Sequence, residues 1–410
     1  MLTLPHIRVR IVGLVGAALL IGASQAMVAA AASVPVVTCG QTITRSTRLT
    51  KDLGPCAGEG LIIGADHLRL DLNGHSIMGT TDSFGDPAAP VGVDLNGHST
   101  VTVRSGTIEN FRTQVQLGRA AATVTHAVIR RLTFVNGELA LDGHADMSVF
   151  AFDTSDATGP PAHLFGGDIQ ITGDGNRLAF DTASRTALGV GGANNRIDHN
   201  HAATIGVGSD GGLALADHNV TQELIIGTGP TVASPSAILS DNTVLPATGP
   251  HPQGATGILL FGASHVIVER NTVSGSGFPG ILVSSGFAQA LTPADGNVLV
   301  DNFVTGALDD GILVTGPTFL PPPLPPILTS AGATNTVLWG NVTVKNGHDP
   351  GFPGQDGIKN DSSSTTFVAN IANDNFNLGI DSVPGVVDGG RNRATGNGNP
   401  LQCVNVACSP

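Results

Sequence analysis

The chain of 410 residues contains few aromatic and few charged residues. It has no Tyr and a single Trp, and charged residues make up only 12% of the sequence. Few aromatics leave few platforms on which sugar rings can stack. A disordered chain is still excluded, because 41% of the residues are hydrophobic.

Positive charge is also scarce. The formal net charge is −13, which argues against nucleic acid or an anionic membrane as a partner. An acidic polysaccharide fits this charge poorly unless cations bridge the two molecules. We expect no membrane association of the mature chain, and a monomer.

The sequence contains no helix-length periodic segment and no fixed Leu-x-x-Leu-x-Leu pattern, which excludes helical and leucine-rich repeats. What recurs instead is a Gly-Ile pair that opens a short apolar run. The five pairs begin at Gly257, Gly280, Gly311, Gly357 and Gly379, with spacings of 23, 31, 46 and 22 residues. Pro- and Gly-rich insertions explain the longer spacings, so the repeating unit is a coil of about 22 residues. Such repeats predict an all-β parallel β-helix in which equivalent residues stack in columns.

A second pattern places an Asn after a short β-type run. It ends at Asn271, Asn302 and Asn341, with a weaker copy at Asn370. These positions predict a ladder at a turn, in which each side-chain amide bonds the next coil.

The first 32 residues predict a signal peptide. Arg8 and Arg10 precede an apolar core from Ile11 to Ile21, and small residues follow near Ala26 and Ala32. We therefore expect a secreted or cell-surface protein with four parts: signal peptide 1–32, N-terminal cap 33–60, β-helix 61–395 and C-terminal loop 396–410.

The four cysteines fall in two local pairs, and four cysteines allow three pairings. We expect Cys39–Cys56 and Cys403–Cys408, because the two ends of a solenoid lie far apart. Each disulfide would pin a terminal cap in an oxidising compartment.

The Cys39 region, the Gly-Ile repeats, the stretch from Asp71 to Ile77 and the ending from Gly396 to Cys403 resemble secreted bacterial β-helix repeat proteins. This resemblance implies the right-handed, single-stranded parallel β-helix of the pectate-lyase-like group. Proteins with this fold include lyases, polygalacturonases and uronan epimerases, as well as members without known catalysis, so the fold alone does not give the activity.

Alignment on the Gly-Ile pairs brings three carboxyls to one corner of two successive coils. These are Asp309, Asp310 and Asp356, and stacking would place the backbones of the last two about 5 Å apart. His348 and Asp349 precede Asp356 in the chain. Lys359 follows it, with Asp381 as its expected column neighbour on the next coil.

Two chemistries fit this corner. Paired carboxyls serve as acid and base or nucleophile in glycoside hydrolysis. Alternatively, Asp309, Asp310, Asp349 and Asp356 would hold Ca²⁺, which binds a uronate while Lys359 or His348 removes a proton. A third explanation is structural, because Asp before Gly is ordinary turn chemistry. The doubled Asp resembles that of β-helix polygalacturonases, but the Gly-His-Gly and Arg-x-Lys signatures of those enzymes are absent.

The sequence therefore predicts a protein that binds or processes a polysaccharide, as a lyase, hydrolase or epimerase. The alternative is a non-catalytic β-helix that binds glycan or acts as a structural module.

A proline-rich insertion, Phe319–Leu328, cannot be a central strand. We expect residues 317–328 to fold over an outward column of Leu259, Leu282 and Leu313.

Overall fold

The computed structural model describes residues 36–80, 86, 88–118, 122–151, 154–156, 169–179, 181–208, 212–227, 236–246, 255–285, 294–319, 328–348 and 355–410. The predicted signal peptide and Asp349 lie outside these residues. Val37–Pro410 forms one unit. The described part of the chain contains no helix with the length and hydropathy of a membrane span.

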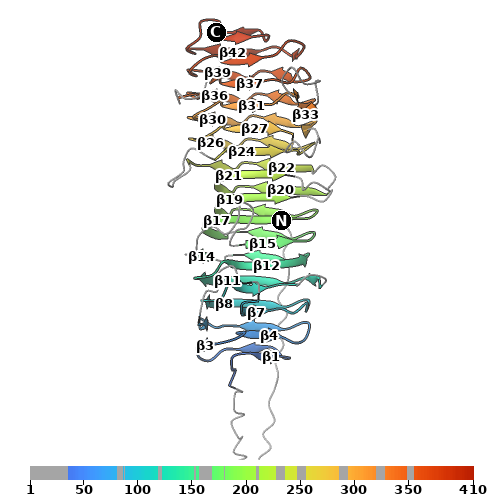
Figure 1. The fold of residues 1–410 in the computed structure, drawn as a ribbon, viewed down its shortest axis with the longest axis vertical. Coiled ribbons are helices and arrows are strands. Elements are labelled where there is room, and N and C mark those ends of the chain that lie inside the picture. The colour runs from blue at the N-terminus through green and yellow to red at the C-terminus, as the bar shows by residue number, and fades with distance from the viewer. Residues whose placement is uncertain are drawn as a thin grey trace, which may run out of the picture. The chain divides into compact units, whose positions relative to one another are not determined.

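The described unit is a right-handed parallel β-helix, as the sequence predicts. Each coil contributes three short strands, and strands of successive coils pair in parallel. The colour gradient therefore runs steadily along the stack (Figure 1). We number the faces in the order in which the chain visits them, so that face 1 carries the Gly-Ile strands.

Face 1 begins inside the predicted cap, since β1 already pairs with β4. Its strands are β1 (Gln41–Ile43), β4 (Leu61–Ile63), β7 (Val91–Asp94), β9 (Thr113–Gln116), β12 (Leu139–Asp146), β15 (Ile169–Thr172), the second halves of β17 (Thr182–Gly191), β19 (His201–Gly208) and β21 (Val220–Gly227), β24 (Ile258–Phe261), β27 (Ile281–Ser284), β31 (Ile312–Val314), β37 (Ile358–Asn360), β40 (Ile380–Ser382) and β43 (Cys403–Val404).

Face 2 follows face 1 in every coil except the last, which goes from β43 directly to face 3. Its strands are β2 (Thr47–Arg48), β5 (Arg69–Asp71), the first halves of β8 (Thr102–Glu109) and β11 (Val128–Val135), β13 (Val149–Ala151), β16 (Arg177–Ala179), β18 (Arg196–Asp198), β20 (Leu213–Asp217), β22 (Ser236–Ser240), β25 (Ile267–Glu269), β29 (Val298–Val300), β35 (Val337–Trp339), β38 (Thr366–Val368) and β41 (Val387–Asp388).

Face 3 closes the coil. It contains β3 (Leu53–Cys56), β6 (Ser76–Gly79), the second halves of β8 and β11, β14 (Thr154–Asp156), the first halves of β17, β19 and β21, β23 (Thr243–Val244), β26 (Thr272–Ser274), β30 (Phe303–Thr305), β36 (Val342–Val344), β39 (Ile371–Asn373), β42 (Asn392–Thr395) and β44 (Cys408–Ser409). Three two-residue strands pair in the turns between faces 1 and 2: β10 (Val124–Thr125), β28 (Ala294–Asp295) and β34 (Ala333–Thr334).

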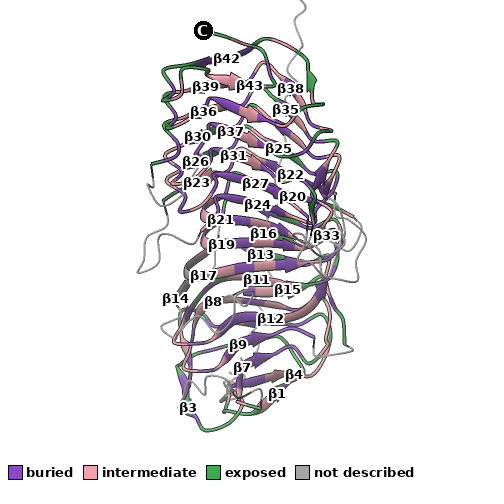
Figure 2. Cartoon of the chain, turned by 45° about the horizontal axis from the view of Figure 1, so that its top comes forward, coloured by how far each residue is buried: buried purple, intermediate pink, exposed green. Residues whose placement is uncertain are grey.

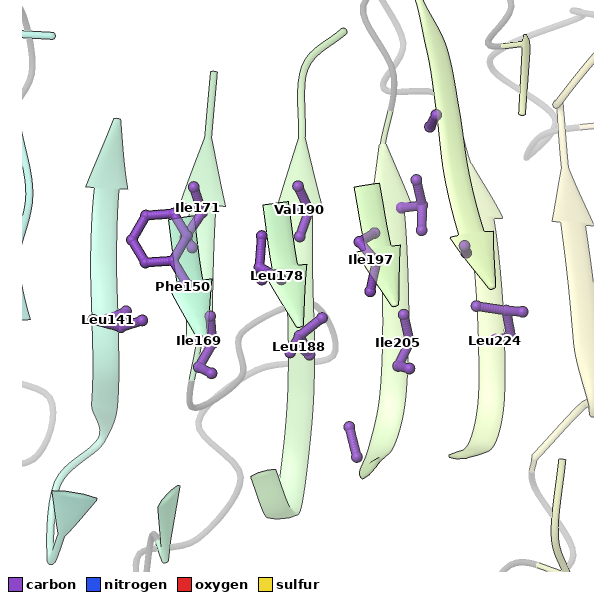
Figure 3. Close-up of a cluster of buried hydrophobic side chains, with 14 of the residues drawn as sticks. Leu141, Phe150, Ile169, Ile171, Leu178, Leu188, Val190, Ile197, Ile205 and Leu224 are labelled. Carbon is purple, nitrogen blue, oxygen red and sulfur yellow. The ribbon is translucent and has the colours of Figure 1, made fainter. Parts of the chain in front are cut away.

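Alternate side chains of each strand point into the coil and stack on the same position of the next coil. Figure 3 shows two such columns, one from Leu141 to Leu224 on face 1 and one from Phe150 to Ile197 on face 2. Buried stretches accordingly recur along the strands (Figure 2). Burial of each large aliphatic side chain contributes about 1.5–3 kcal/mol, so a core of fixed width lengthens with every coil.

The Gly-Ile register is confirmed. Ile258, Ile281, Ile312, Ile358 and Ile380 are direct pairing partners, and each is 0% exposed. The structure also explains why a glycine precedes each of these isoleucines. A Cβ on Gly311 would lie 2.7 Å from the Asn346 side-chain nitrogen and 2.5 Å from a backbone oxygen of the next coil. Any larger residue would therefore separate the coils.

The predicted Asn ladder is present at the turn between faces 2 and 3. In each step, the backbone N–H of one Asn donates to Oδ1 of the Asn on the next coil, at 3.1–3.2 Å from Asn271 to Asn341. The eight ladder residues are Asn200, Asn219, Asn242, Asn271, Asn302, Asn341, Asn370 and Asn392. A shorter ladder of Asn346, Asn375 and Asn397 runs at the turn between faces 3 and 1.

Both predicted disulfides are confirmed, with Cα–Cα distances of 5.6 Å for Cys39–Cys56 and 6.2 Å for Cys403–Cys408. Each clips a terminal coil locally. The stretch predicted as the N-terminal cap contains β1, β2 and β3, which form a coil of their own. The exact limits of the caps stay a prediction.

The described ends of the proline-rich insertion form an antiparallel pair, β32 (Thr318–Phe319) with β33 (Leu328–Ser330). Residues 320–327 lie outside the described part of the chain. The outward leucines Leu259, Leu282 and Leu313 are half-buried. The prediction that the insertion covers them stays a prediction.

Candidate functional site

The acidic corner is the turn from face 3 into face 1, at the start of β31 and β37. We define it by Asp309, Asp310 and Asp356. The two strands pair in parallel with Ile312 opposite Ile358, and Gly311 N–H donates to the Asp356 carbonyl at 3.0 Å. This register places Asp310 and Asp356 on neighbouring coils, as the sequence predicts.

Asp310 is only 6% exposed. Its Oδ1 accepts a hydrogen bond of 2.6 Å from the Asp356 backbone N–H. Burial, with a smaller contribution from the charges of Asp309 and Asp356, raises the pKa of Asp310 to about 8. The Asp310 carboxyl is therefore mainly protonated at pH 7 and has an O–H to donate.

Asp356 is fully buried. Its Oδ1 accepts hydrogen bonds from Leu378 N–H at 2.9 Å and from Asn377 Nδ2 at 2.8 Å. Its Oδ2 has no hydrogen-bond partner among the described residues. Burial raises the pKa of Asp356 to about 6, although the Leu378 hydrogen bond opposes the rise. The two carboxyls thus favour different protonation states at neutral pH.

Asp309 is the more accessible carboxyl of the corner. It is half-buried, and burial raises its pKa even though its carboxylate accepts the Asp310 backbone N–H. A ligand on face 1 would meet Asp309 before it met Asp310 or Asp356.

Lys359 and Asp381 lie on the outer side of face 1, next to this corner. They are register partners on β37 and β40 and form an ion pair. The Lys359 ammonium is also 3.9 Å from Asp361. Burial works to lower the pKa of Lys359, but the hydrogen bond to Asp381 and the nearby carboxylates outweigh it, so the pKa is raised. A raised pKa disfavours Lys359 as a proton acceptor.

The other two predicted site residues, His348 and Asp349, are not shown in contact with the acidic corner. His348 is exposed, and no hydrogen bond or ion pair joins it to the acidic corner among the described residues. Asp349 lies outside them. The structure therefore brings together Asp309, Asp310 and Asp356, with the Lys359–Asp381 pair beside them.

Sequence reasoning missed Glu223, at the start of the face 1 half of β21. Its carboxylate is largely buried and accepts the backbone N–H of Thr256 on the next coil. Burial raises the pKa of Glu223 to about 7. Leu224 pairs with Ile258, so Glu223 occupies the position of the glycine in a Gly-Ile pair. Alignment on Gly-Ile alone could not find a coil that lacks the glycine.

The structure describes only Asp309, Asp310 and Asp356 of the expected calcium ligands. Ca²⁺ takes six to eight oxygen ligands, whereas Oδ1 of both Asp310 and Asp356 is already occupied by a backbone N–H. No group of three or more His, Cys, Asp or Glu side chains in the described ranges is arranged to hold a metal ion. The calcium site therefore stays a prediction, and no step below uses the ion.

No protein-family model and no curated protein matches the chain. Several solved structures are similar at low identity. The A-module of mannuronan C-5 epimerase AlgE6 from Azotobacter vinelandii has 13% identity and a TM-score of 0.38, with 91% of each chain covered. A mutant of the periplasmic alginate epimerase AlgG has 12% identity and a TM-score of 0.37, with 78% of each chain covered.

A hyperthermoactive exopolygalacturonase from Thermotoga maritima has 11% identity and a TM-score of 0.37, covering 74% of this chain and 84% of its own. Identities and scores this low transfer neither residues nor activities. The chain's own strand pairing, and not these likenesses, establishes it as a parallel β-helix.

Proposed function

We propose that this protein is a secreted β-helix that binds and processes a polysaccharide on face 1, with the acidic corner as its reactive site. The observation that carries the proposal is the pair of buried carboxyls, Asp310 and Asp356, whose pKa values are raised to about 8 and about 6. A neutral carboxyl beside an ionised one is the arrangement that acid–base cleavage of glycosides requires.

In this proposal the three carboxyls have different tasks. Asp309 is the half-buried group that a sugar hydroxyl or glycosidic oxygen reaches. Asp310, which is mainly protonated at pH 7, would give its proton to the leaving glycosidic oxygen, and the Asp309 carboxylate would take one from the attacking water. Asp356 lies on the next coil beside Asp310. The raised pKa values keep this proton available at neutral pH, since an ordinary Asp would be ionised.

Export is supported by the two disulfides and by the predicted signal peptide. Disulfides persist in oxidising compartments and are rare in the cytosol. Secretion would place the acidic corner where extracellular or periplasmic polysaccharides are found.

A second candidate function is glycan binding without catalysis. It is favoured by the burial of Asp310 and Asp356 and by the way each Oδ1 accepts a backbone N–H of the next coil. In this alternative the two carboxyls only align the coils, and Asp309, Lys359 and Asp381 form a polar binding surface.

The test is a panel of uronans and neutral glycans, with and without Ca²⁺, assayed for new reducing ends, unsaturated uronate and epimerised sugars. We expect product from at least one polysaccharide, and its loss in Asp309→Asn and Asp310→Asn. The matched control is Asp301→Asn, because Asp301 is an exposed turn residue with φ 51°. Binding with no product from any glycan would establish the non-catalytic alternative, and neither binding nor product would overturn both.

A further inference from the structure

Face 2 of the first coils contains a hollow of about 360 Å³, lined by Ser46, Thr47, Arg48, Arg69, Asp71 and Arg104. These residues come from β2, β5 and β8, which pair in order. The hollow lies on a different face from the acidic corner and many coils away from it in the stack. Nothing in the proposed chemistry of the acidic corner uses it.

The lining of this hollow carries a surplus of two positive charges, since three guanidinium groups face one carboxylate. Asp71 Oδ2 accepts from Arg104 at 2.7 Å and from Arg69 at 3.5 Å, and Arg48 donates to Asn73 Oδ1. Each guanidinium has five N–H donors. Most of these donors therefore have no acceptor among the described residues, and Arg104 Nε is one of them.

The same face shows what a balanced arrangement looks like further along the stack. Arg177 forms two hydrogen bonds of 2.9 and 2.8 Å with Asp198. Arg196 contacts both Asp198 and Asp217, at 3.1 and 3.2 Å. Two arginines there meet two carboxylates, and no charge is left over. The arginines of the hollow are therefore not explained by ion pairing within the face.

Positive charge recurs on each of the first four coils of face 2. Arg48, Asp71, Arg104 and Arg130 are successive register partners in one column. On the second coil the guanidinium is that of Arg69, two residues before Asp71 on the same strand. Stacked coils repeat about every 4.8 Å. An extended polyanion that lies along this face would meet a guanidinium at every coil, whereas a free ion would use one position only.

We propose that this hollow binds the carboxylate or sulfate groups of an anionic polysaccharide, with Arg48, Arg69 and Arg104 as the anion ligands. Guanidinium groups suit these ligands because their planar forks match the geometry of an oxyanion. The proposal takes from the proposed function only that the ligand is a polysaccharide. It gives the acidic chain, of net charge −13, a local surface for a ligand that its overall charge would repel.

The experiment measures equilibrium binding of polygalacturonate, dextran sulfate, neutral dextran and inorganic sulfate to the full chain at low and moderate salt. We expect both polyanions to bind, with an affinity that falls as salt rises, and neutral dextran not to bind. The double variant Arg48→Gln/Arg104→Gln should weaken polyanion binding about ten-fold or more. The control Arg391→Gln/Arg393→Gln removes the same charge from two exposed positions and should change binding little.

Thermal unfolding checks that each variant folds. Should the double variant not fold, Arg48→Gln replaces an exposed side chain and should still weaken binding measurably. Equal polyanion binding by variant and wild type would overturn the proposal, as would binding of inorganic sulfate without binding of either polyanion. Failure of the acidic corner appears as absence of product in the glycan panel, whereas failure of the hollow appears as unchanged polyanion binding by the double arginine variant, so the two failures give different results.

Discussion

Two columns of side chains, one of asparagines and one of aspartates, bridge successive coils at their turns. At the turn between faces 2 and 3, eight buried asparagines form a continuous ladder. At the turn between faces 3 and 1, Asp310 and Asp356 each accept a backbone N–H from the next coil, whereas each ladder asparagine accepts one from the coil before it. Both columns use a side-chain oxygen as the acceptor, but the second polar atom of the side chain differs, since it is a nitrogen in asparagine and an oxygen in aspartate.

An asparagine has a donor as well as an acceptor. Asn302 Nδ2 donates to the Val268 carbonyl at 2.8 Å while its Oδ1 accepts from Asn271. An ionised aspartate has no donor, and Oδ2 of Asp356 is buried without a partner among the described residues. Aspartate in this position costs stability, and protonation reduces that cost. The raised pKa values of the acidic corner follow from this difference.

The largest expected effect comes from breaking the Asn ladder. Asn302→Ala would leave the Asn271 backbone N–H buried without its acceptor, and would remove the hydrogen bonds from Asn271 Nδ2 to Asn302 Oδ1 and from Asn302 Nδ2 to the Val268 carbonyl. The buried N–H costs about 1–3 kcal/mol and each lost hydrogen bond about 0.5–1.5 kcal/mol, so the free energy of unfolding should fall by about 2–6 kcal/mol. Chemical denaturation measures it, with Asp301→Asn at the neighbouring exposed position as the control. A loss below about 1 kcal/mol would mean that the ladder contributes little.

The second variant, Asp356→Asn, should raise stability instead of lowering it. Asp356→Asn keeps an oxygen for Leu378 N–H and removes a buried carboxylate, so we expect stability at pH 8 to rise by about 1–3 kcal/mol. If the acidic corner is reactive, the same variant loses turnover. Greater stability together with full activity would show that Asp356 only aligns the coils.

The third effect is the pH dependence of stability. Asp310, Asp356 and Glu223 have pKa values raised to about 8, 6 and 7 in the folded protein, so the folded state binds more protons than the unfolded state above about pH 4. Stability should therefore fall as pH rises from 5 to 8, because these groups must ionise while buried. In Asp310→Asn, the loss of unfolding free energy between pH 5 and pH 8 should be smaller by at least about 1 kcal/mol. Unfolding at several pH values checks this, and a wild-type curve that rises from pH 5 to 8 would contradict it.

The fold was predictable because ladders constrain residue identity. A buried Asn must both donate and accept, and Gly311 must make room for Asn346, so these residues recur in the sequence. The coils before residue 250 lack the Gly-Ile pair, and their register could not be predicted. The sequence Asp-Leu-Asn-Gly-His-Ser occurs twice, starting at Asp71 and at Asp94. The two copies are not equivalent, because Asp71 lies on face 2 and Asp94 on face 1.

The sites were only partly predictable. The sequence placed Asp310 and Asp356 together, because both precede a Gly-Ile pair. It could not give their burial, from which the raised pKa values arise. The hollow on face 2 had no sequence signal either, since Arg48, Arg69 and Arg104 have no common motif and an insertion separates the last two.

The smallest expected effect is at the edge of the acidic corner, where Lys359 pairs with Asp381. Lys359→Met removes a partly exposed ion pair, which costs about 0.2–1 kcal/mol and less at high salt. The Lys359 charge also lowers the pKa of both Asp310 and Asp356. Without it, both carboxyls should titrate at higher pH, which carboxyl-selective NMR titration would detect. The Asn ladder contains no titrating group, so the stability contributed by its turn should not change with pH in this variant. Unchanged titration of Asp356 would mean that solvent already screens Lys359 from the acidic corner.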